Sequence, residues 1–123
     1  MSDANPKDLL GIRKVPLNLL PTAGLIHEAM AMKNGAQKYG PFNWRDKKVL
    51  SSIYVAACQR HLLAWFDGEE LAPDSGLHHL GHAKACLGII LDALETGCLL
   101  DDRPLPGATS QLLDRFEEPR EDK

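Results

Sequence analysis

Length, composition and charge restrict what this chain can be. It has 123 residues and a formal net charge of −3, with 44% apolar and 25% charged residues. Such values predict one soluble globular domain with an ordinary core. Nucleic-acid interfaces usually carry a basic surplus, so we expect no stable nucleic-acid binding. No apolar run approaches the roughly 20 residues that cross a bilayer, and we expect neither a membrane span nor a signal peptide. Three widely spaced cysteines predict reduced thiols and a cytoplasmic protein.

The single expected domain spans residues 1–123 and begins with an irregular arm at 1–21. Pro6, Gly11, Pro16 and Pro21 divide this arm too closely for a long helix. We expect its apolar side chains to lie on the core, namely Val15, Leu17, Leu19 and Leu20. At the other end we expect a short helix near residues 110–117 and a charged, frayed tail at 118–123.

The first long helix is expected over residues 23–36, with Thr22 as its N-cap. Apolar residues at helical spacing predict its buried face: Leu25, Ile26, Ala29 and Met30. Glu28 flanks that face, and there a solvated role is slightly favoured over a role in a site.

A loop rich in glycine, proline and asparagine follows at residues 33–48, with the sequence KNGAQKYGPFNWRDKK. It interleaves aromatic and basic side chains. Aromatic faces can stack on a base, amides can bond its edge, and basic groups can bind phosphate. We expect Phe42 to fill the core beneath the loop, and Lys38, Asn43 and Trp44 to contact a ligand.

The second long helix is expected over residues 48–66 and ends at Asp67–Gly68. Its apolar stripe comprises Leu50, Ile53, Tyr54, Ala57, Cys58, His61, Leu62 and Trp65. A histidine on such a stripe is more often a hydrogen-bonded core residue than a ligand, which favours the core role for His61. Arg60 lies beside the stripe and can orient a carboxylate or bind phosphate through two hydrogen bonds.

The stretch from Arg60 to Ala83 concentrates carboxylates and imidazoles around one turn. It contains His61, His78, His79, His82, Asp67, Glu69, Glu70 and Asp74. Carboxylate oxygens hold hard divalent cations, and imidazole joins them for softer ions such as manganese or zinc. On a helix, His82 can share one cation with either His78 or His79. This stretch is the candidate metal site.

The third long helix is expected over residues 76–95, capped by Asp74 or Ser75 and closed by Gly97. One apolar face comprises His79, Ala83, Cys86, Ile90 and Ala93, and an adjacent one comprises Leu80, Leu87, Leu91 and Leu94. So wide an apolar surface is typical of a helix buried in a bundle or a subunit interface. Beyond it, Asp101, Asp102 and Arg103 are expected to form a loop ion pair rather than an intersubunit contact.

Five segments, in this order, resemble the phage dATP/dGTP diphosphohydrolases, which are small all-α, MazG-like enzymes. The segments are KVPLNLLP, the helix with Glu28, NGAQKYGPFNWR, QRHLLAWFDGEE and DSGLHHLGHA. The resemblance implies an all-α, MazG-like helical bundle assembled as a homodimer or homotetramer. It also implies hydrolysis of a deoxypurine nucleoside triphosphate to the monophosphate and pyrophosphate, with Mg²⁺ or Mn²⁺. We expect dGTP to be slightly preferred over dATP. The implied setting is phage nucleotide metabolism in the host cytoplasm, including precursor supply for 2-aminoadenine.

The resemblance also transfers roles to matching residues. It assigns substrate binding to Glu28, Lys38, Tyr39, Asn43, Trp44, Arg60 and His61. It assigns catalysis to Glu69, Glu70 and Asp74, and metal binding to the same three carboxylates with His79 and His82. Two positions depart from the family pattern. Ala72 stands where relatives often have an acid, which leaves the exact ligand set open, and His78 stands where many have proline, which makes it a weak ligand candidate.

In the expected mechanism, metal-bound hydroxide attacks the α-phosphorus and pyrophosphate leaves. Lys38 and Arg60 offset phosphate charge. Two alternatives stay open. One is a zinc-dependent hydrolase that uses the HHxxH histidines, and the other is a non-enzymatic helical oligomerisation or regulatory module.

Overall fold

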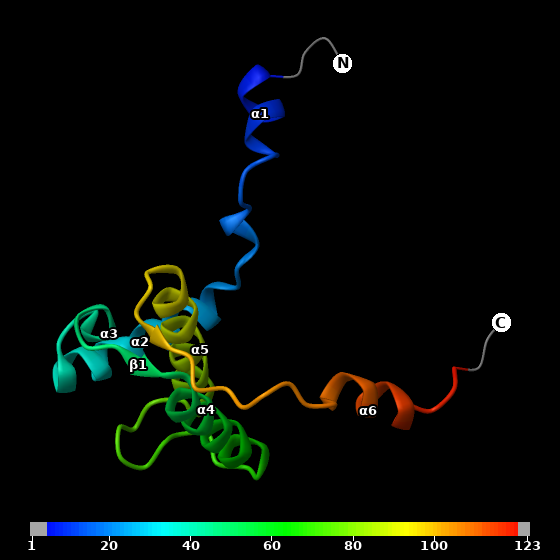
Figure 1. Cartoon of the computed structure of the whole chain (residues 1–123). Coiled ribbons are helices and arrows are strands. Elements are labelled where there is room, and N and C mark those ends of the chain that lie inside the picture. Colours follow the sequence, from blue (N-terminus) through cyan, green and yellow to red (C-terminus); the bar gives the residue numbers. More distant parts are fainter. Residues whose placement is uncertain (1–4, 121–123) are drawn as a thin grey trace.

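Three long helices form the body of the protein in this computed structural model, which describes residues 5–120. They are α2 (Thr22–Tyr39), α4 (Ser51–Phe66) and α5 (His79–Glu95), shown in Figure 1. α5 is the central element, because it packs against both α2 and α4. The expected all-α fold is confirmed. Residues 1–4 of the expected arm and 121–123 of the expected tail lie outside the described range.

Small residues let α5 lie close to its neighbours. Its buried positions include Ala83, Ala85, Cys86 and Ala93. At Gly81 a Cβ atom would lie 2.5 Å from the carbonyl oxygen of His27, so the backbones of α5 and α2 meet there. Only glycine allows this approach without displacing one of the helices.

A two-stranded parallel sheet ties the start of α4 to the chain that leaves α5. It pairs β1 (Val49–Leu50) with β2 (Leu99–Leu100). The buried side chain of Val49 packs in one cluster with Trp44 of α3 (Asn43–Asp46) and Ala93. The second long helix therefore starts at Ser51 rather than at residue 48, because Val49 and Leu50 pair with a distant strand.

Asp102 caps α4 from the other end of the chain. Its carboxylate accepts hydrogen bonds from the backbone N–H of Ser52 at 2.8 Å, from the hydroxyl of Ser51 at 2.7 Å, and from the hydroxyl of Ser52. The hydroxyls of Ser52 and Ser51 are the main reason that the pKa of Asp102 falls to about 2. The expected ion pair of the loop forms between Asp101 and Arg103, at 2.7 Å.

Helix ends depart from the expected caps in two places. Thr22 is the first residue of α2 and not its N-cap, and α2 continues to Tyr39, where Gly40 with a φ of 93° ends it. α5 begins only at His79, because Leu71 and His78 pair in an antiparallel bridge. The expected cap at Asp74 or Ser75 is wrong, since His78 caps α5 by accepting from the backbone N–H of Leu80 at 3.0 Å. The stop at Asp67–Gly68 is confirmed.

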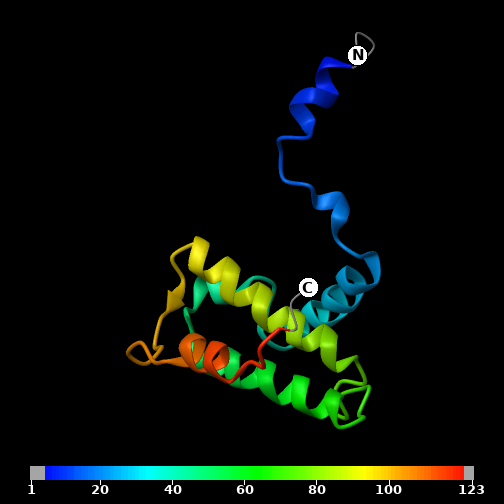
Figure 2. The same cartoon turned by 90° about the vertical axis from the view of Figure 1, so that its right-hand side faces the viewer.

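Two terminal segments project from the body. The first contains α1 (Pro6–Gly11) and the 3₁₀ turn η1 (Leu17–Leu19), and it leaves α2 away from the other helices (Figures 1 and 2). Its Val15, Leu17, Leu19 and Leu20 are exposed, so the expectation that they lie on the core is wrong. The second contains α6 (Thr109–Phe116), which confirms the short helix expected near residues 110–117.

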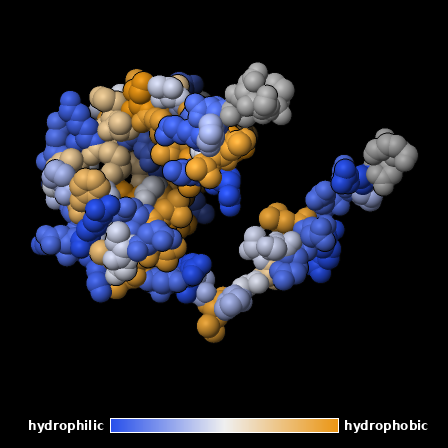
Figure 3. Space-filling view, turned by 90° about the horizontal axis from the view of Figure 1, so that it is seen from above, coloured by the Kyte–Doolittle hydropathy of each residue, from blue (hydrophilic) through white to orange (hydrophobic). Residues whose placement is uncertain are grey.

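Several helical stripes that are apolar in sequence are exposed in the structure. Leu25, Ile26 and Met30 of α2 face outward, because α2 turns Glu28 and Ala31 towards α5. On α4 and α5, the exposed members of the expected stripes are Leu50, Ile53, Leu62, Trp65, Leu87, Leu91 and Leu94. Figure 3 shows apolar side chains on the surface of the body and of the C-terminal segment. None of the helices within residues 5–120 is long and apolar enough to cross a membrane.

Candidate functional site

A groove of about 580 Å³ lies over α5, between α2 and α4. Its apolar lining comprises Met32 and Ala36 from α2, Tyr54 and Ala57 from α4, and Ala85, Cys86 and Ile89 from α5. Burial raises the pKa of the Cys86 thiol to about 11, so this wall carries no charge at neutral pH. The groove therefore offers an apolar wall to one part of a ligand.

The same groove brings together eight of the residues that the sequence marked as site candidates. They are Lys38, Tyr39, Asn43, Trp44, Arg60, His61, Asp74 and His82. These residues come from the end of α2, from α3, from α4, from the turn that follows α4, and from α5. Glu69, Glu70, His79 and Glu28 do not line it. Glu28 lies at the contact of α2 with α5, where its Oε1 is 3.7 Å from Nζ of Lys84.

A chain of hydrogen bonds links Glu69 to the groove through two histidines. His79 is only 5% exposed; its Nε2 lies 2.7 Å from Oε1 of Glu69 and its Nδ1 lies 2.9 Å from Nδ1 of His61. A carboxylate accepts, so Nε2 of His79 donates and its Nδ1 is left to accept from Nδ1 of His61. This arrangement leaves Nε2 of a neutral His61 without a proton, and His61 lines the groove.

His82 lies next to His61 at the same end of the groove. The two rings stack with centroids 4.7 Å apart, and Nε2 of His82 is 2.7 Å from the hydroxyl oxygen of Ser75. Burial is the largest cause that lowers the pKa of both imidazoles. Both rings are therefore neutral near pH 7, the form that can accept a proton or bind a metal ion.

The residues expected to bind metal are only partly assembled for that role. Within residues 5–120, no three histidine, cysteine or acidic side chains converge as ligands of a single ion. Glu69 bonds to His79, and Oε2 of Glu70 lies 3.0 Å from Nε2 of His78. Asp74 differs, because the backbone N–H of Ser75 lowers its pKa and its carboxylate lines the groove. Oxygen from Asp74 and nitrogen from His82 suit Mn²⁺, and oxygen donors suit Mg²⁺.

Trp44 is the buried aromatic residue of this segment, and Phe42 is the exposed one. Trp44 is 5% exposed and its indole N–H donates to Oδ2 of Asp92 at 2.7 Å. Phe42 is 55% exposed, with a φ of 54°, so the expectation that it fills the core is wrong. The Arg45 guanidinium lies 4.6 Å from the centroid of the Phe42 ring and also pairs with Asp92 at 2.8 Å. Trp44 forms part of the groove wall from its buried position.

The sequence pattern does not predict the roles of two polar residues near the site. Ser75, considered only as a helix cap, bonds to His82. Asp92, whose pKa Arg45 and Trp44 lower to about 2, fixes the Trp44 indole. The sequence does show that Asp92 is an acid among apolar neighbours of the helix, between Ile90 and Ala93, and this position could have indicated a buried partner. Its indole partner lies far away in sequence and carries no such signal.

Two comparisons with known proteins point to the same family. The family model described as dATP/dGTP diphosphohydrolase, N-terminal, matches residues 4–103. A dATP/dGTP diphosphohydrolase of Salmonella phage PMBT28 is 31% identical over 102 residues, which cover 80% of this chain and 34% of that protein. The chain thus spans about a third of the length of this curated relative. No solved structure matches this chain. The family match includes every residue that lines the groove. Because it extends over most of the 123 residues, the chain belongs to the dATP/dGTP diphosphohydrolase N-terminal family.

Proposed function

We propose that the groove binds a deoxypurine nucleoside triphosphate and that the protein hydrolyses it to the monophosphate and pyrophosphate. The observation that carries this proposal is one groove in which an apolar, aromatic wall meets Lys38, Arg60, His61 and Asp74. A nucleotide has the same division between a flat base and a charged phosphate chain. The family membership and the name of the phage relative support the same activity.

The base is proposed to lie at the segment that joins α2 to α3. Tyr39 and Phe42 offer exposed rings for stacking, and Asn43 offers an amide for the base edge. Trp44 serves as a wall, because Asp92 holds its indole in the core. We propose both dGTP and dATP as substrates, with dGTP slightly preferred, in phage nucleotide metabolism that includes precursor supply for 2-aminoadenine.

The triphosphate is proposed to lie at the Lys38 and Arg60 end. Lys38 lies near enough to Asp74 and His82 to lower the pKa of each, so cationic, acidic and imidazole groups share this region. Lys38 and Arg60 neutralise phosphate charge. Nε2 of His61, kept free of a proton by the bonds to His79 and Glu69, is positioned to accept the proton of the attacking water.

We propose Mg²⁺ or Mn²⁺ as the cofactor, held by Asp74 and His82 in the groove. Such an ion lowers the pKa of a bound water and neutralises phosphate oxygens. Nε2 of His82 would have to leave the Ser75 hydroxyl to bind the ion. Glu69, Glu70 and His79, the other expected ligands, lie outside the groove lining, where Glu69 bonds to His79 and Glu70 to His78. A zinc site built on the HHxxH motif is less well supported, because Nδ1 of His78 is engaged at the start of α5.

Pyrophosphate release from each of the four dNTPs, with Mg²⁺ or Mn²⁺, tests the proposal. We expect cleavage of dGTP and dATP, and a fall in kcat/KM of about tenfold or more for Lys38→Gln, Arg60→Gln and Asp74→Asn. Lys48→Gln is the matched control, since Lys48 is exposed and lies outside the groove. If the three groove variants retain wild-type activity, the groove is not the site.

A further inference from the structure

The chain exposes far more surface than a compact protein of its mass. Its accessible surface is 10197 Å², whereas a folded monomer of 13.5 kDa exposes roughly 6,500 Å². Among the described residues, no large side chain is fully buried. The apolar side chains that a core normally buries are therefore left for a partner to cover.

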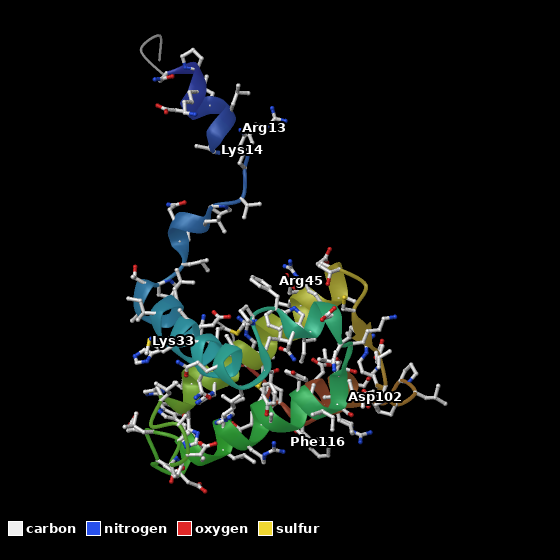
Figure 4. All side chains as sticks on the ribbon, turned by 90° about the vertical axis from the view of Figure 1, so that its left-hand side faces the viewer. Arg13, Lys14, Lys33, Arg45, Asp102 and Phe116 are labelled. Atoms are coloured by element: carbon white, nitrogen blue, oxygen red, sulfur yellow. The ribbon has the colours of Figure 1, made fainter. Side chains whose placement is uncertain are left out.

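The N-terminal arm, residues 5–20, carries a large share of this surface. Its exposed apolar side chains are Leu9, Leu10, Ile12, Val15, Leu17, Leu19 and Leu20, and Ile12 is 80% exposed. The arm is also basic, with Lys7, Arg13 and Lys14 against the single acid Asp8. Figure 4 shows Arg13 and Lys14 on the arm, away from the body. A partner surface for this arm must be apolar and acidic.

The body offers such a surface where α4 ends. We call residues 63–74 the acidic end, because they contain four acids and neither lysine nor arginine. Leu63, Phe66 and Leu71 are exposed there, and Phe66 is 83% exposed. The acidic end thus has a charge opposite to that of the arm, and both surfaces expose apolar side chains. Within one chain the arm leads away from this end of the body (Figures 1 and 2).

We infer that two copies of this chain form a dimer in which the N-terminal arm of each docks on the acidic end of the other. Donor and acceptor surfaces lie on the same chain, so one two-fold axis satisfies both contacts at once. A stable interface buries about 800 Å² per partner, well below the excess of roughly 3,700 Å² that each chain exposes. This docking of arms specifies a contact for the oligomer expected from the family resemblance, and it does not depend on nucleotide hydrolysis.

Molar mass in solution, measured by sedimentation of the full chain without nucleotide, tests whether the arms dock between two chains. We expect an assembly of at least two 13.5 kDa chains. The double variant Leu10→Glu/Ile12→Glu should weaken it by about 100-fold or more, because charge replaces two apolar contacts. Leu105→Glu is the control at a site that is 90% exposed and outside both surfaces. A monomeric wild type, or an arm variant that keeps the wild-type mass, overturns the inference.

A charge exchange then tests which surfaces meet. Arg13→Glu/Lys14→Glu in one chain and Asp67→Lys in another should each weaken self-association, by roughly fivefold. Mixing the two chains should restore wild-type affinity. In the mixed dimer the acidic arm of the first variant meets the end that carries Asp67→Lys, and the wild-type basic arm meets the wild-type acidic end, so both contacts join opposite charges. Asp67 is the C-cap residue of α4 and is not one of the proposed site residues. If tagged chains of the two kinds show no preference for each other, the arm docks elsewhere and the inference fails.

Discussion

Asp92 determines which aromatic side chain of the segment before α4 is buried. Its carboxylate accepts the Trp44 indole N–H and pairs with Arg45, so a polar group of Trp44 is satisfied inside the core. Phe42 needs no such partner, and its left-handed backbone directs it outward beneath Arg45. Aromatic content in the sequence predicts a site at this segment, but it does not distinguish the two rings.

Trp44→Ala should lower the free energy of unfolding by about 3–5 kcal/mol, because it removes a large buried side chain. Phe42→Ala is the matched control and should change it by no more than about 1 kcal/mol. Urea denaturation followed by circular dichroism measures both. Equal losses would contradict the assigned environments.

Glu69 acts, in this account, through His79 on the proton state of His61. Glu69→Gln should reduce kcat by about 10–100-fold. A carboxylate can only accept from Nε2 of His79, whereas an amide can also donate to it, so the variant no longer fixes which nitrogen of His79 carries the proton. The Mn²⁺ concentration for half-maximal rate should stay unchanged. A large increase in that concentration would instead make Glu69 a metal ligand.

At the scale of elements, the groove exists because α2 and α4 both pack on α5. Patterning predicted the three helices and the buried face of α5, with His79, Ala83, Cys86 and Ala93. It failed for the rotation of α2 and for Val49–Leu50, since periodicity does not reveal which neighbour a face meets or which distant strand pairs with it.

Gly81→Ala should destabilise the protein by about 1–3 kcal/mol, because its methyl group would strike the backbone of His27. Gly35→Ala in α2 is the control. No atom lies within 4 Å of a Cβ there, so the change should be neutral or stabilising by up to about 1 kcal/mol. Thermal unfolding compares the two, and equal effects would contradict the close contact of α2 with α5.

Asp102→Asn should weaken α4 in a pH-dependent manner. The folded-state pKa of Asp102 is about 2, below its ordinary value of 3.8, so its carboxylate stabilises the folded protein above pH 3.8. This stabilisation is lost as the pH falls from 3.8 through 2. Wild type and variant should therefore differ most at neutral pH and converge near pH 2. A difference that persists unchanged at pH 2 would show that the charge of Asp102 is not involved.

At the scale of the whole molecule, the candidate site is built from residues that lie far apart in sequence. The residues Lys38, Arg60 and Asp74 were predictable as candidates from their types and from the family resemblance, and one groove brings them together. The engagement of Glu69 with His79 and of Glu70 with His78 was not predictable, because it depends on the bridge between Leu71 and His78. The exposure of the apolar stripes was not predictable either, because helical periodicity does not show whether a neighbouring element covers an apolar face.

Product analysis is the most direct test of the proposed reaction. Wild-type protein incubated with dGTP and Mn²⁺ or Mg²⁺ should yield dGMP and pyrophosphate in equal amounts, with dATP giving dAMP and pyrophosphate. Formation of dGDP and phosphate, release of deoxyguanosine and triphosphate, or no turnover of either purine nucleotide would contradict the account.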